Sequence, residues 1–434
     1  MPPVDSKTIR IGLLGCGNVG GALIALIERN GDEIATRTGV RLEITRVAVR
    51  SLSKDRQVAV DPELLTTDGL EVVAGRDVDL VVELIGGIEP AREFITAALE
   101  AGKPVVTGNK ELLANVGAEL AAIAEAHGVD LLFEAAVAGG IPLVRPLRES
   151  LVGEQISRVM GIVNGTTNFI LSQMTEHGTG YAEALAEAQS LGFAERDPTA
   201  DVEGFDAAAK AAIIASIAFG ARVVAGDVYR EGISDISGAD ISFADRMGYR
   251  IKLLAICESF DDGSVAVRVH PAMVPAAHPL AAVSGSFNAV FVEGDAVGDL
   301  MFYGRGAGGS PSASAVLGDV IDAAVNLQKG SHASLGTFTR RRIRSIDEVS
   351  SAFYVNLVVA DEPGVLAAVA GAFGRHGVSI RSMEQSDLGD GARIVFITHE
   401  AGESAVRSTL RELNDLPAVR RVNSVLRVIE GSDS

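Results

Sequence analysis

The sequence lacks several residue types that mark particular classes of protein. It has no tryptophan and only 5% aromatic residues, which argues against a surface that binds bases or sugars by stacking. Positive charge is also scarce, because 38 Lys and Arg residues face 57 Asp and Glu residues and the formal net charge is −19. Nucleic-acid binding depends on clustered Lys and Arg side chains, so we expect no nucleic-acid partner.

Cysteines and long hydrophobic runs are scarce as well. The two cysteines, Cys16 and Cys257, are far apart and do not have the spacing of a metal site. They do not support a disulfide framework, and two free thiols are typical of a protein in the reducing cytoplasm. The apolar stretch at residues 211–221, which lies between Lys210 and Arg222, is too short to span a bilayer, so we expect a cytoplasmic protein with no membrane partner.

The first third of the chain alternates short β-branched runs with helical patterns. This alternation predicts βαβ units and a doubly wound parallel sheet in a domain that spans residues 1–150. A late helix near residues 310–330 is expected to pack back onto this domain and complete it. The predicted strands are 9–14, 42–49, 78–84, 104–107 and 129–134, and the predicted helices are 18–36, 90–101 and 111–127.

The ordered alternation ends at about residue 151, where an α+β domain that extends to residue 309 is expected. Residues 164–168 form a polar, glycine-containing turn in this prediction, and two alanine-rich helices follow at about 181–191 and 204–219. Residues 340–350 are basic and polar and are predicted to be a linker. The last segment, 351–434, has the βαββαβ pattern of a ferredoxin-like fold.

The segment Gly-Cys-Gly-Asn-Val-Gly follows the first predicted strand and opens the first predicted helix, as the dinucleotide-binding fingerprint requires. In a Rossmann domain Gly15 allows the tight turn, Gly17 lets the backbone approach a pyrophosphate, and Gly20 permits close packing of helix on strand. The alternative is a tight strand-to-helix turn without a ligand. The expected cofactor contacts in this segment are Gly15, Gly17, Asn18, Val19 and Gly20.

Two basic residues extend the predicted cofactor site. The second strand ends at Arg50 instead of at the carboxylate that binds the ribose of NAD, which favours NADP and leaves NAD as the second choice. The alternative for Arg50 is a solvated surface side chain. Lys110 begins a helix directly after a strand, at the sheet edge where ligands bind, although it could also be purely structural.

The stretch 188–210 carries the strongest local pattern in the chain. Asp206 and Lys210 are four residues apart and share one face of an apolar helix, while Glu195, Asp197 and Asp201 add carboxylates nearby. This arrangement suits a substrate with an ammonium group that also needs a proton relay. The alternative is an ordinary surface ion pair, which contributes a few tenths of a kcal/mol.

The same stretch, with every Gly, Asp, Pro and Lys in place over 23 residues, resembles the homoserine dehydrogenase signature. Residues 134–142 and 164–168 are also similar to segments of that family, and the resemblance extends over the whole chain. The C-terminal module resembles an ACT domain, because Asp-Glu-Pro-Gly-Val-Leu at 361–366 matches the strand-to-helix turn of that family.

The resemblance implies reversible reduction of L-aspartate 4-semialdehyde to L-homoserine, in threonine, methionine and isoleucine biosynthesis. The family varies in cofactor preference, so the choice of NADP rests on Arg50. The same resemblance implies catalytic roles for Lys210, Lys110 and Asp206, and substrate contacts at Glu195, Asp206, Asn164, Gly165, Thr166 and Lys210. Lys110 is also expected at the cofactor. A monovalent cation, sodium, is expected at Glu134, Val137, Gly139 and Ile141.

The resemblance also implies that the glycine-rich residues 304–309 line the active-site cleft and that residues 151–309 include the dimerisation surface. ACT domains pair edge to edge and bind amino acids between protomers. We therefore expect a homodimer or homotetramer with threonine as an effector, and the alternative for this module is a purely structural dimerisation unit.

Two other functions remain open at this point. The first is a different Rossmann oxidoreductase that acts on another small amino-acid aldehyde or ketone, although it does not account for the full stretch 188–210. The second is a non-catalytic regulator that binds NADP and an amino acid. No kinase-sized segment precedes residue 9, so a fused kinase is not expected.

Overall fold

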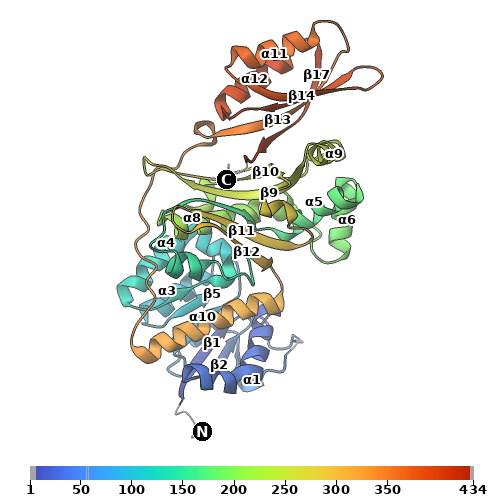
Figure 1. The fold of residues 1–434 in the computed structure, drawn as a ribbon. Helices are drawn as coiled ribbons and strands as arrows, with labels where there is room; N and C mark the ends of the chain where they lie inside the picture. Colours follow the sequence, from blue (N-terminus) through green and yellow to red (C-terminus); the bar gives the residue numbers. More distant parts are fainter. Residues whose placement is uncertain (1–5, 55, 57, 431–434) are drawn as a thin grey trace. The chain divides into compact units, whose positions relative to one another are not determined.

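The structure is a computed structural model that describes residues 6–54, 56 and 58–430 (Figure 1). These residues form two compact units, each assembled from several stretches of chain. Unit 1 holds the described residues up to 156 together with 209–227 and 293–341, and unit 2 holds 157–208, 228–292 and the described residues from 342 onward. The outer ends of the first and last predicted domains, residues 1–5 and 431–434, lie outside the described residues.

A parallel sheet of six strands forms the centre of unit 1. Its order is β3-β2-β1-β4-β5-β6, and each neighbouring pair runs parallel. The chain builds outward from β1 on one side and then from β4 on the other, which leaves a ligand crevice at the carboxyl ends of these two strands. The strands are β1 (Lys7–Leu14), β2 (Val40–Ala48), β3 (Leu65–Thr66), β4 (Leu80–Glu83), β5 (Val105–Thr107) and β6 (Leu131–Leu132). This arrangement confirms the predicted Rossmann fold.

Helices from distant parts of the sequence cover this sheet. The helices of unit 1 are α1 (Asn18–Thr38), α2 (Gly69–Ala74), α3 (Ala91–Glu100), α4 (Lys110–His127) and α10 (Gly309–Lys329). α10 lies along the sheet domain in Figure 1, and its Val316 and Val320 share one hydrophobic core with Ile11 and Leu23. Strand β12 (Gly298–Arg305) leads into α10.

Unit 2 contains a mixed sheet whose strands run in the order β11-β7-β9-β10-β17-β13-β15-β14. Its two halves are joined where β10 and β17 pair in parallel, with Ala272 opposite Arg427. The first half consists of β7 (Ile156–Ile162), β9 (Tyr249–Ser259), β10 (Val265–Pro275) and β11 (Phe287–Gly294), together with the short β8 (Tyr229–Arg230). The helices of this part are α5 (Gly165–His177), α6 (Tyr181–Ser190), α7 (Thr199–Val202) and α9 (Gly238–Arg246).

The C-terminal part of unit 2 has the predicted βαββαβ order. Its four main strands are antiparallel neighbours in the order β17-β13-β15-β14, which is the ferredoxin-like arrangement of an ACT domain. The elements are β13 (Ser350–Val359), α11 (Val365–Arg375), β14 (Ile380–Asp387), β15 (Ala392–Thr398), β16 (Ala401–Gly402), α12 (Glu403–Asp415) and β17 (Val419–Val428).

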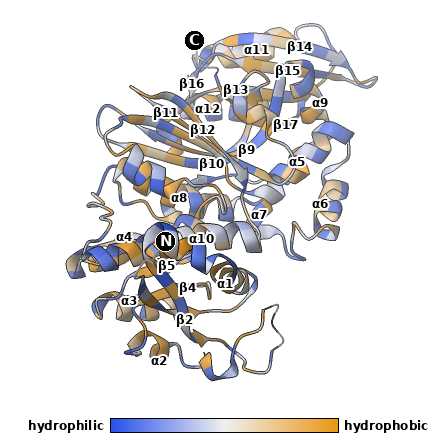
Figure 2. Ribbon diagram, turned by 60° about the horizontal axis from the view of Figure 1, so that its bottom comes forward, coloured by the Kyte–Doolittle hydropathy of each residue, from blue (hydrophilic) through white to orange (hydrophobic). Residues whose placement is uncertain are grey.

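Helix α8 (Phe205–Phe219) is the second alanine-rich helix that the sequence predicts. It is mostly hydrophobic (Figure 2), and its Ala211, Ala212 and Ala215 are fully buried. Within the described part of the chain, neither α8 nor another helix has both the length and the hydropathy needed to cross a membrane.

Two local predictions differ from the structure. The predicted turn at 164–168 is instead the start of α5, because the Asn164 side chain caps this helix and accepts a hydrogen bond from the Thr167 N–H. The predicted strand 129–134 is reduced to Leu131–Leu132, and Glu134 begins a 3₁₀ turn. Within the segment 340–350, which the sequence predicts as a linker, the backbones of Arg342 and Arg344 both hydrogen-bond to that of Val265 in β10.

Candidate active site

The glycines of the fingerprint have different local surroundings. Gly15 has a φ of +99°, and a Cβ there would lie 2.8 Å from the carbonyl oxygen of Leu84. At Gly20 a Cβ would lie 2.3 Å from the carbonyl oxygen of Gly15, so the close approach of α1 to β1 requires glycine. A Cβ at Gly17 would meet nothing within 4 Å. Gly17 is the N-cap of α1 and therefore presents backbone N–H groups to open space.

A cavity of about 470 Å³ opens beside these glycines, at the carboxyl ends of β1, β2 and β4. Gly15 and Gly17 line it together with three basic residues from the loop after β2, Arg50, Lys54 and Arg56. The Arg56 guanidinium donates to the carbonyl oxygens of Leu52 and Lys54 and so shapes this loop. Of the other expected contacts, Asn18 is exposed on the first turn of α1, and Val19 packs against the core of the sheet domain.

A buried carboxylate that sequence reasoning missed organises the mouth of the crevice. Glu83 ends β4 and is fully buried. Its Oε1 accepts hydrogen bonds from the backbone N–H groups of Ile85 and Gly86, at 2.8 and 3.1 Å, and its Oε2 accepts the Thr107 hydroxyl proton at the end of β5. Thr107 Oγ1 in turn accepts a hydrogen bond from the Asn109 N–H. The Glu83 side chain thereby fixes the loops after β4 and β5, and both loops contribute residues to a second cavity.

Lys110 and Lys210 line the same cavity of about 290 Å³. Lys110 is the first residue of α4, directly after the N-cap Asn109, and is exposed. Lys210 comes from α8 and is only 8% exposed. The glycine-rich segment contributes Gly306 and Ala307 to this lining. Unit 1 thus brings the two sequence-predicted lysines together at the carboxyl edge of its sheet, next to the glycine-rich segment.

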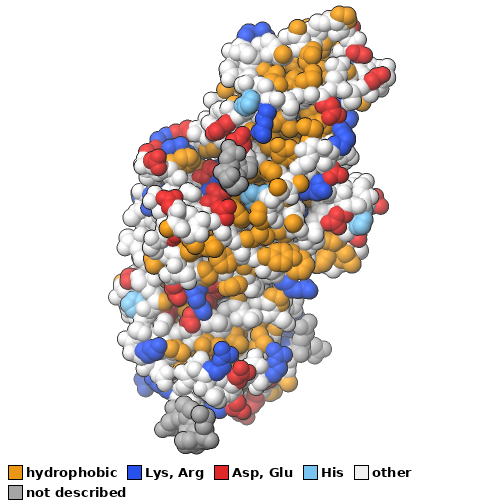
Figure 3. All heavy atoms as spheres, viewed as in Figure 1, with side chains coloured by type: hydrophobic (Ala, Val, Ile, Leu, Met, Phe, Trp, Pro, Cys, Tyr) orange, Lys and Arg blue, Asp and Glu red, His pale blue; other side chains and the backbone are white. Residues whose placement is uncertain are grey.

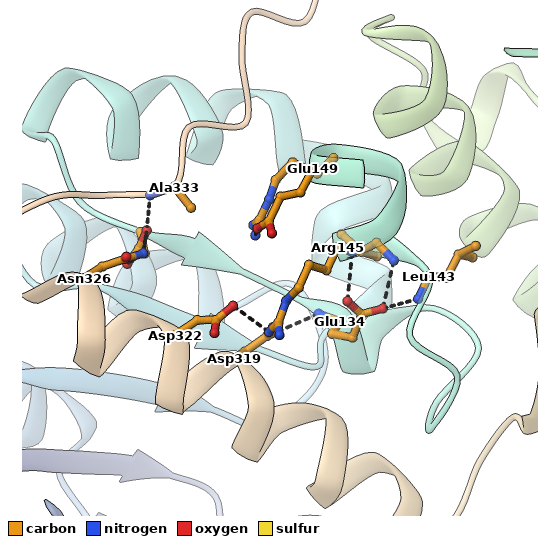
Figure 4. A network of polar contacts seen from close by, with 11 residues as sticks. Glu134, Leu143, Arg145, Glu149, Asp319, Asp322, Asn326 and Ala333 are labelled. Atoms are coloured by element: carbon orange, nitrogen blue, oxygen red, sulfur yellow. Dashed lines mark hydrogen bonds and ion pairs between the residues drawn. The ribbon is translucent and has the colours of Figure 1, made fainter. Parts of the chain in front are cut away.

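The predicted cation-binding segment is a tightly wound loop (Figure 4). The Glu134 carboxylate accepts hydrogen bonds from the backbone N–H groups of Leu143, Val144 and Arg145, at 2.5, 2.8 and 2.9 Å. Both of its oxygens are therefore directed at the backbone that follows the loop. The described residues contain no group of three His, Cys, Asp or Glu side chains placed to hold a metal ion. The oxygens that this loop can offer a cation are consequently backbone carbonyls.

The loop has little freedom to change its shape. Ala138 and Gly139 both have a φ of 55°, and a Cβ at Gly139 would lie 2.2 Å from the carbonyl oxygen of Gly306. Val137 and Ile141 are buried, with 0% and 2% of their surface exposed, and their apolar side chains offer no donor to a cation. A set of carbonyl oxygens is the donor type that a hard cation such as sodium prefers.

A second carboxylate supports this loop from α10. Asp319 is 3% exposed; its Oδ2 accepts the Glu134 N–H at 2.7 Å, and its Oδ1 lies 3.2 Å from the Arg145 guanidinium (Figure 4). Burial, reinforced by the nearby charge of Glu134, raises the pKa of Asp319 to about 7. Arg145 also pairs with Asp322 at 2.8 Å. These contacts join residues that are far apart in the sequence, and local patterns do not predict them.

Unit 2 assembles the second group of predicted residues around Asn164. The Asn164 side-chain amide donates to Asp201 Oδ1 at 2.7 Å and to Asp206 Oδ2 at 2.8 Å, while its oxygen accepts the Thr167 N–H at 2.9 Å. One buried amide thus holds two carboxylates and caps α5. Asp206 is 8% exposed and lies one helical turn from Lys210 on α8.

The remaining predicted substrate residues have local roles in the structure. Gly165 lies close to the chain, since a Cβ there would be 2.7 Å from the carbonyl oxygen of Ser286, and the Thr166 hydroxyl donates to the carbonyl oxygen of Phe193 at 2.7 Å. Glu195 is exposed. Asp197 is turned into its own loop, where its carboxylate accepts the N–H and hydroxyl protons of Thr199. These two hydrogen bonds lower the pKa of Asp197.

Comparison with known proteins shows which family has this combination of elements. The family model described as homoserine dehydrogenase matches residues 142–321, its NAD binding domain matches 15–134, and the ACT domain matches 353–418. Homoserine dehydrogenase of Corynebacterium glutamicum is 53% identical over 427 residues, which cover 97% of this chain and 96% of that protein.

Solved structures agree with these matches. A homoserine dehydrogenase from Thiobacillus denitrificans has a TM-score of 0.93 at 41% identity, covering 98% of this chain and 99% of that chain. A mutant of a hyperthermophilic archaeal homoserine dehydrogenase, solved in complex with NADPH, has a TM-score of 0.64 at 29% identity and covers 74% of this chain and 98% of that chain.

Proposed function

Because this chain belongs to the homoserine dehydrogenase family, we propose that it interconverts L-homoserine and L-aspartate 4-semialdehyde with NADP(H), in threonine, methionine and isoleucine biosynthesis. The observation that carries the assignment of the catalytic groups is the cavity that Lys110 and Lys210 line together, at the ligand-binding edge of a Rossmann sheet. Two cationic side chains at this position suit a reaction that develops negative charge on oxygen.

The proposed chemistry assigns proton transfer to a lysine. When bound, the nicotinamide cofactor supplies or accepts the hydride at the carbon that bears the oxygen. During reduction the carbonyl oxygen becomes an alkoxide, which an ammonium group of Lys210 or Lys110 stabilises and protonates. During oxidation the same nitrogen, in its neutral form, takes the hydroxyl proton. General acid–base catalysis of this kind contributes about 10²- to 10⁴-fold.

The substrate amino group is assigned to the carboxylates of unit 2. In this proposal Asp206 and Glu195 bind the ammonium group, and Asn164, Gly165 and Thr166 shape the site. Asn164 supports this role because it fixes the orientation of Asp206, which is nearly buried. A buried carboxylate attracts an ammonium group more strongly than an exposed one, since solvent screens the interaction less.

NADP is favoured over NAD by the basic loop after β2. Arg50, Lys54 and Arg56 line the cofactor cavity, and a ribose 2′-phosphate would find a cationic surface there. The archaeal relative solved with NADPH supports the same preference. Arg50→Gln is expected to lower kcat/KM for NADP about 10- to 100-fold and to leave kcat/KM for NAD nearly unchanged. Equal losses with both cofactors would contradict the assignment of Arg50 to the phosphate.

A monovalent cation, sodium, is proposed at the loop that follows Glu134. Carbonyl oxygens of Glu134, Val137, Gly139 and Ile141 would hold it. The left-handed residues of this loop and its contact with Gly306 support a preformed site, because the backbone is constrained without a bound ion. The cation would stiffen the loop that lies beside the lysine cavity.

Regulation and assembly are proposed for the C-terminal module and for β12. An ACT domain suggests control by an amino acid, and threonine is the expected effector. Hydrophobic side chains gather on the surface over β12 (Figure 3), where Met301 is 36% and Tyr303 is 56% exposed. Exposed apolar patches mark contact surfaces, so we propose a homodimer or homotetramer that covers this strand.

Chemical rescue distinguishes the two lysines. Lys210→Ala and Lys110→Ala are each assayed with and without added methylamine. A lysine that transfers the proton loses at least about 10²-fold in kcat on substitution and regains part of it with the amine, while a lysine that only binds does not. If both variants turn over like the wild type, the catalytic proposal is wrong.

A further inference from the structure

The loop after β4 separates the cofactor cavity from the cavity that contains the two lysines. Leu84 and Ile85 line the first of these cavities, Gly87 lines the second, and Gly86 lines both. Hydride transfer requires the reactive end of the cofactor to meet the substrate in a defined geometry. Because the two cavities adjoin at this loop, its position affects the distance over which the hydride moves.

Side-chain packing does not hold the middle of this loop. Gly86 and Gly87 have φ values of +72° and +75°, in the left-handed region that glycine adopts without strain. A Cβ at Gly86 would meet nothing within 4 Å, and one at Gly87 would meet only the Glu89 carbonyl oxygen, at 3.9 Å. Glycine also loses more conformational freedom on folding than any other residue. The shape of the loop therefore depends on its hydrogen bonds.

Glu83, the last residue of β4, provides these hydrogen bonds. Its Oε1 accepts the N–H groups of Ile85 and Gly86, at 2.8 and 3.1 Å. Its Oε2 accepts the hydroxyl proton of Thr107, which is opposite Glu83 on the neighbouring strand β5. One carboxylate therefore holds the loop after β4 and the end of β5 at the same time.

The connection continues from β5 to the first lysine. Thr107 Oγ1 accepts the Asn109 N–H at 3.0 Å, and the Asn109 amide donates to the Gly87 carbonyl oxygen at 2.6 Å. The Asn109 side-chain oxygen accepts the Leu112 N–H at 3.1 Å and caps α4, whose first residue is Lys110. The start of α4 is thus tied to the loop after β4 twice, through the carboxylate of β4 and through Asn109.

The chemistry of Glu83 is unusual for a residue that only stabilises a strand. Glu83 is fully buried, and the other three residues of β4, Leu80, Val81 and Val82, are apolar. Burial of a carboxylate is unfavourable unless hydrogen bonds replace the lost water, and the three donors that replace it here are neutral. An apolar residue would stabilise β4 without this loss of solvation. Local rules of this kind are broken most often at functional sites.

We propose that Glu83 is a positioning residue for the transfer step. Through Gly86 it sets the wall against which the reactive end of the cofactor lies, and through Thr107 it sets the start of α4 with Lys110. Glu83 itself lines neither cavity, so it acts through these two loops and not on the substrate. This inference rests on the proposed dehydrogenase function and deepens it, because it assigns the alignment of hydride and proton transfer to one buried group.

The variants separate alignment from stability. Thr107→Val removes the hydroxyl and keeps the shape of the side chain, whereas Thr107→Ser keeps the hydroxyl. Glu83→Gln keeps an oxygen for Ile85 and Gly86 and replaces the oxygen that faces Thr107 by an amide group. Asp130→Asn is the matched control, because Asp130 is also buried, at 1% exposure, and precedes β6 at the opposite, amino edge of the same sheet.

Four measurements are made on the full chain. Initial rates give kcat and the KM for homoserine, fluorescence titration gives the dissociation constant of NADPH, and urea denaturation gives the free energy of unfolding. Hydrogen exchange of the cofactor-free protein adds a readout that does not depend on activity. In Thr107→Val, faster exchange of the Ile85 and Gly86 amides would show that the carboxylate couples the two loops, because both amides bond to Glu83 and not to Thr107.

We expect Thr107→Val and Glu83→Gln to lower kcat about 10- to 100-fold, because a displacement of about 1 Å can cost about 10²-fold in rate. The dissociation constant of NADPH should change by no more than about 3-fold, and the Ile85 and Gly86 amides should exchange faster. Thr107→Ser should regain most of the lost kcat, and Asp130→Asn should keep the wild-type kcat.

Two outcomes would overturn the inference and leave the proposed function standing. In the first, Thr107→Val and Glu83→Gln lose stability alone, as we expect for Asp130→Asn. In the second, both variants lose affinity for NADPH and keep the wild-type kcat. If folded wild-type protein does not turn over homoserine with either nicotinamide cofactor, the proposed function and this inference both fail.

Discussion

Replacing Asn164 with alanine tests the geometry that connects the substrate carboxylates to the fold. The wild-type side chain caps α5 by accepting from Thr167, and its amide donates to Asp201 and to the nearly buried Asp206. Alanine removes all three hydrogen bonds and leaves two neighbouring carboxylates without their shared donor. The variant should therefore lose both stability and affinity for homoserine.

The magnitude can be worked out contact by contact. Loss of an N-cap costs about 0.5–2 kcal/mol. Loss of the hydrogen bond to the ionised, nearly buried Asp206 costs about 1.5–3 kcal/mol, and loss of the bond to the more exposed Asp201 costs less, since water replaces it. The sum is roughly 2–5 kcal/mol. Asn164→Ser keeps a capping oxygen but has no amide, so it should recover only the capping contribution, about 0.5–2 kcal/mol.

Urea denaturation followed by circular dichroism measures the change in the free energy of unfolding, and initial rates give the KM for homoserine. We expect the order wild type, Asn164→Ser, Asn164→Ala in stability, with KM raised in both variants. If Asn164→Ala is as stable as the wild type within 0.5 kcal/mol, the bridging role assigned to Asn164 is wrong. If serine and alanine variants are equally destabilised, the helix-capping part of the argument fails.

Three further predictions concern other parts of the chain. Gly20→Ala should destabilise unit 1 and abolish cofactor binding, because its Cβ would lie 2.3 Å from a carbonyl oxygen. Gly17→Ala should fold normally and only lower the affinity for NADP, because a Cβ at that position meets nothing within 4 Å. Equal thermal stability of the two variants would contradict this. Burial lowers the pKa of Lys252 from 10.5 to about 8, so the folded state disfavours its ammonium form. The free energy of unfolding of the wild type, relative to that of Lys252→Met, should therefore rise by roughly 3 kcal/mol between pH 8 and pH 10.5. Urea titrations in which this difference does not change with pH would refute the prediction. Asp240 of α9 accepts hydrogen bonds from Tyr354, Asn356 and Ser424, so Asp240→Ala leaves these donors without an acceptor. The variant should lose about 3–5 kcal/mol in the free energy of unfolding and show faster amide exchange in β13. Unchanged exchange in β13 would show that Asp240 does not hold this strand.

The Rossmann sheet and the ACT module could be predicted because their signals are local. Alternation of β-branched and helical runs gives βαβ units, and the glycine spacing at 15–20 has a direct backbone cause, as the positive φ of Gly15 and the close approach at Gly20 demonstrate. The middle of the chain was predicted less well. A segment that begins Asn-Gly-Thr-Thr has the composition of a turn, and only the hydrogen bond from Thr167 shows that Asn164 begins a helix.

Residues that act through distant contacts could not be found in this way. Glu83 holds the ends of two strands through Thr107, which is 24 residues away, and Asp319 supports Glu134 across 185 residues. Glu83 is a single carboxylate at the end of an apolar strand, and that contrast is a signal that could have indicated it. Asp319 has no such signal, because Asp322 lies on the same helix. The sequence does not show that Arg56 lines the cofactor cavity. Three basic residues follow β2, and a loop has no periodicity that indicates which of them point toward the ligand.

The most direct test of the central claim is the initial rate of homoserine-dependent NADP⁺ reduction by the purified protein, measured in parallel for Lys210→Ala. We predict turnover by the wild type and a loss of at least about 10²-fold in the rate of the variant. The reason is that Lys210, a nearly buried lysine in the shared cavity, stabilises the negative charge on oxygen or transfers the proton to it. Absence of turnover by folded wild-type protein with either nicotinamide cofactor would contradict the dehydrogenase function. Turnover that Lys210→Ala leaves unchanged would contradict the role of this lysine.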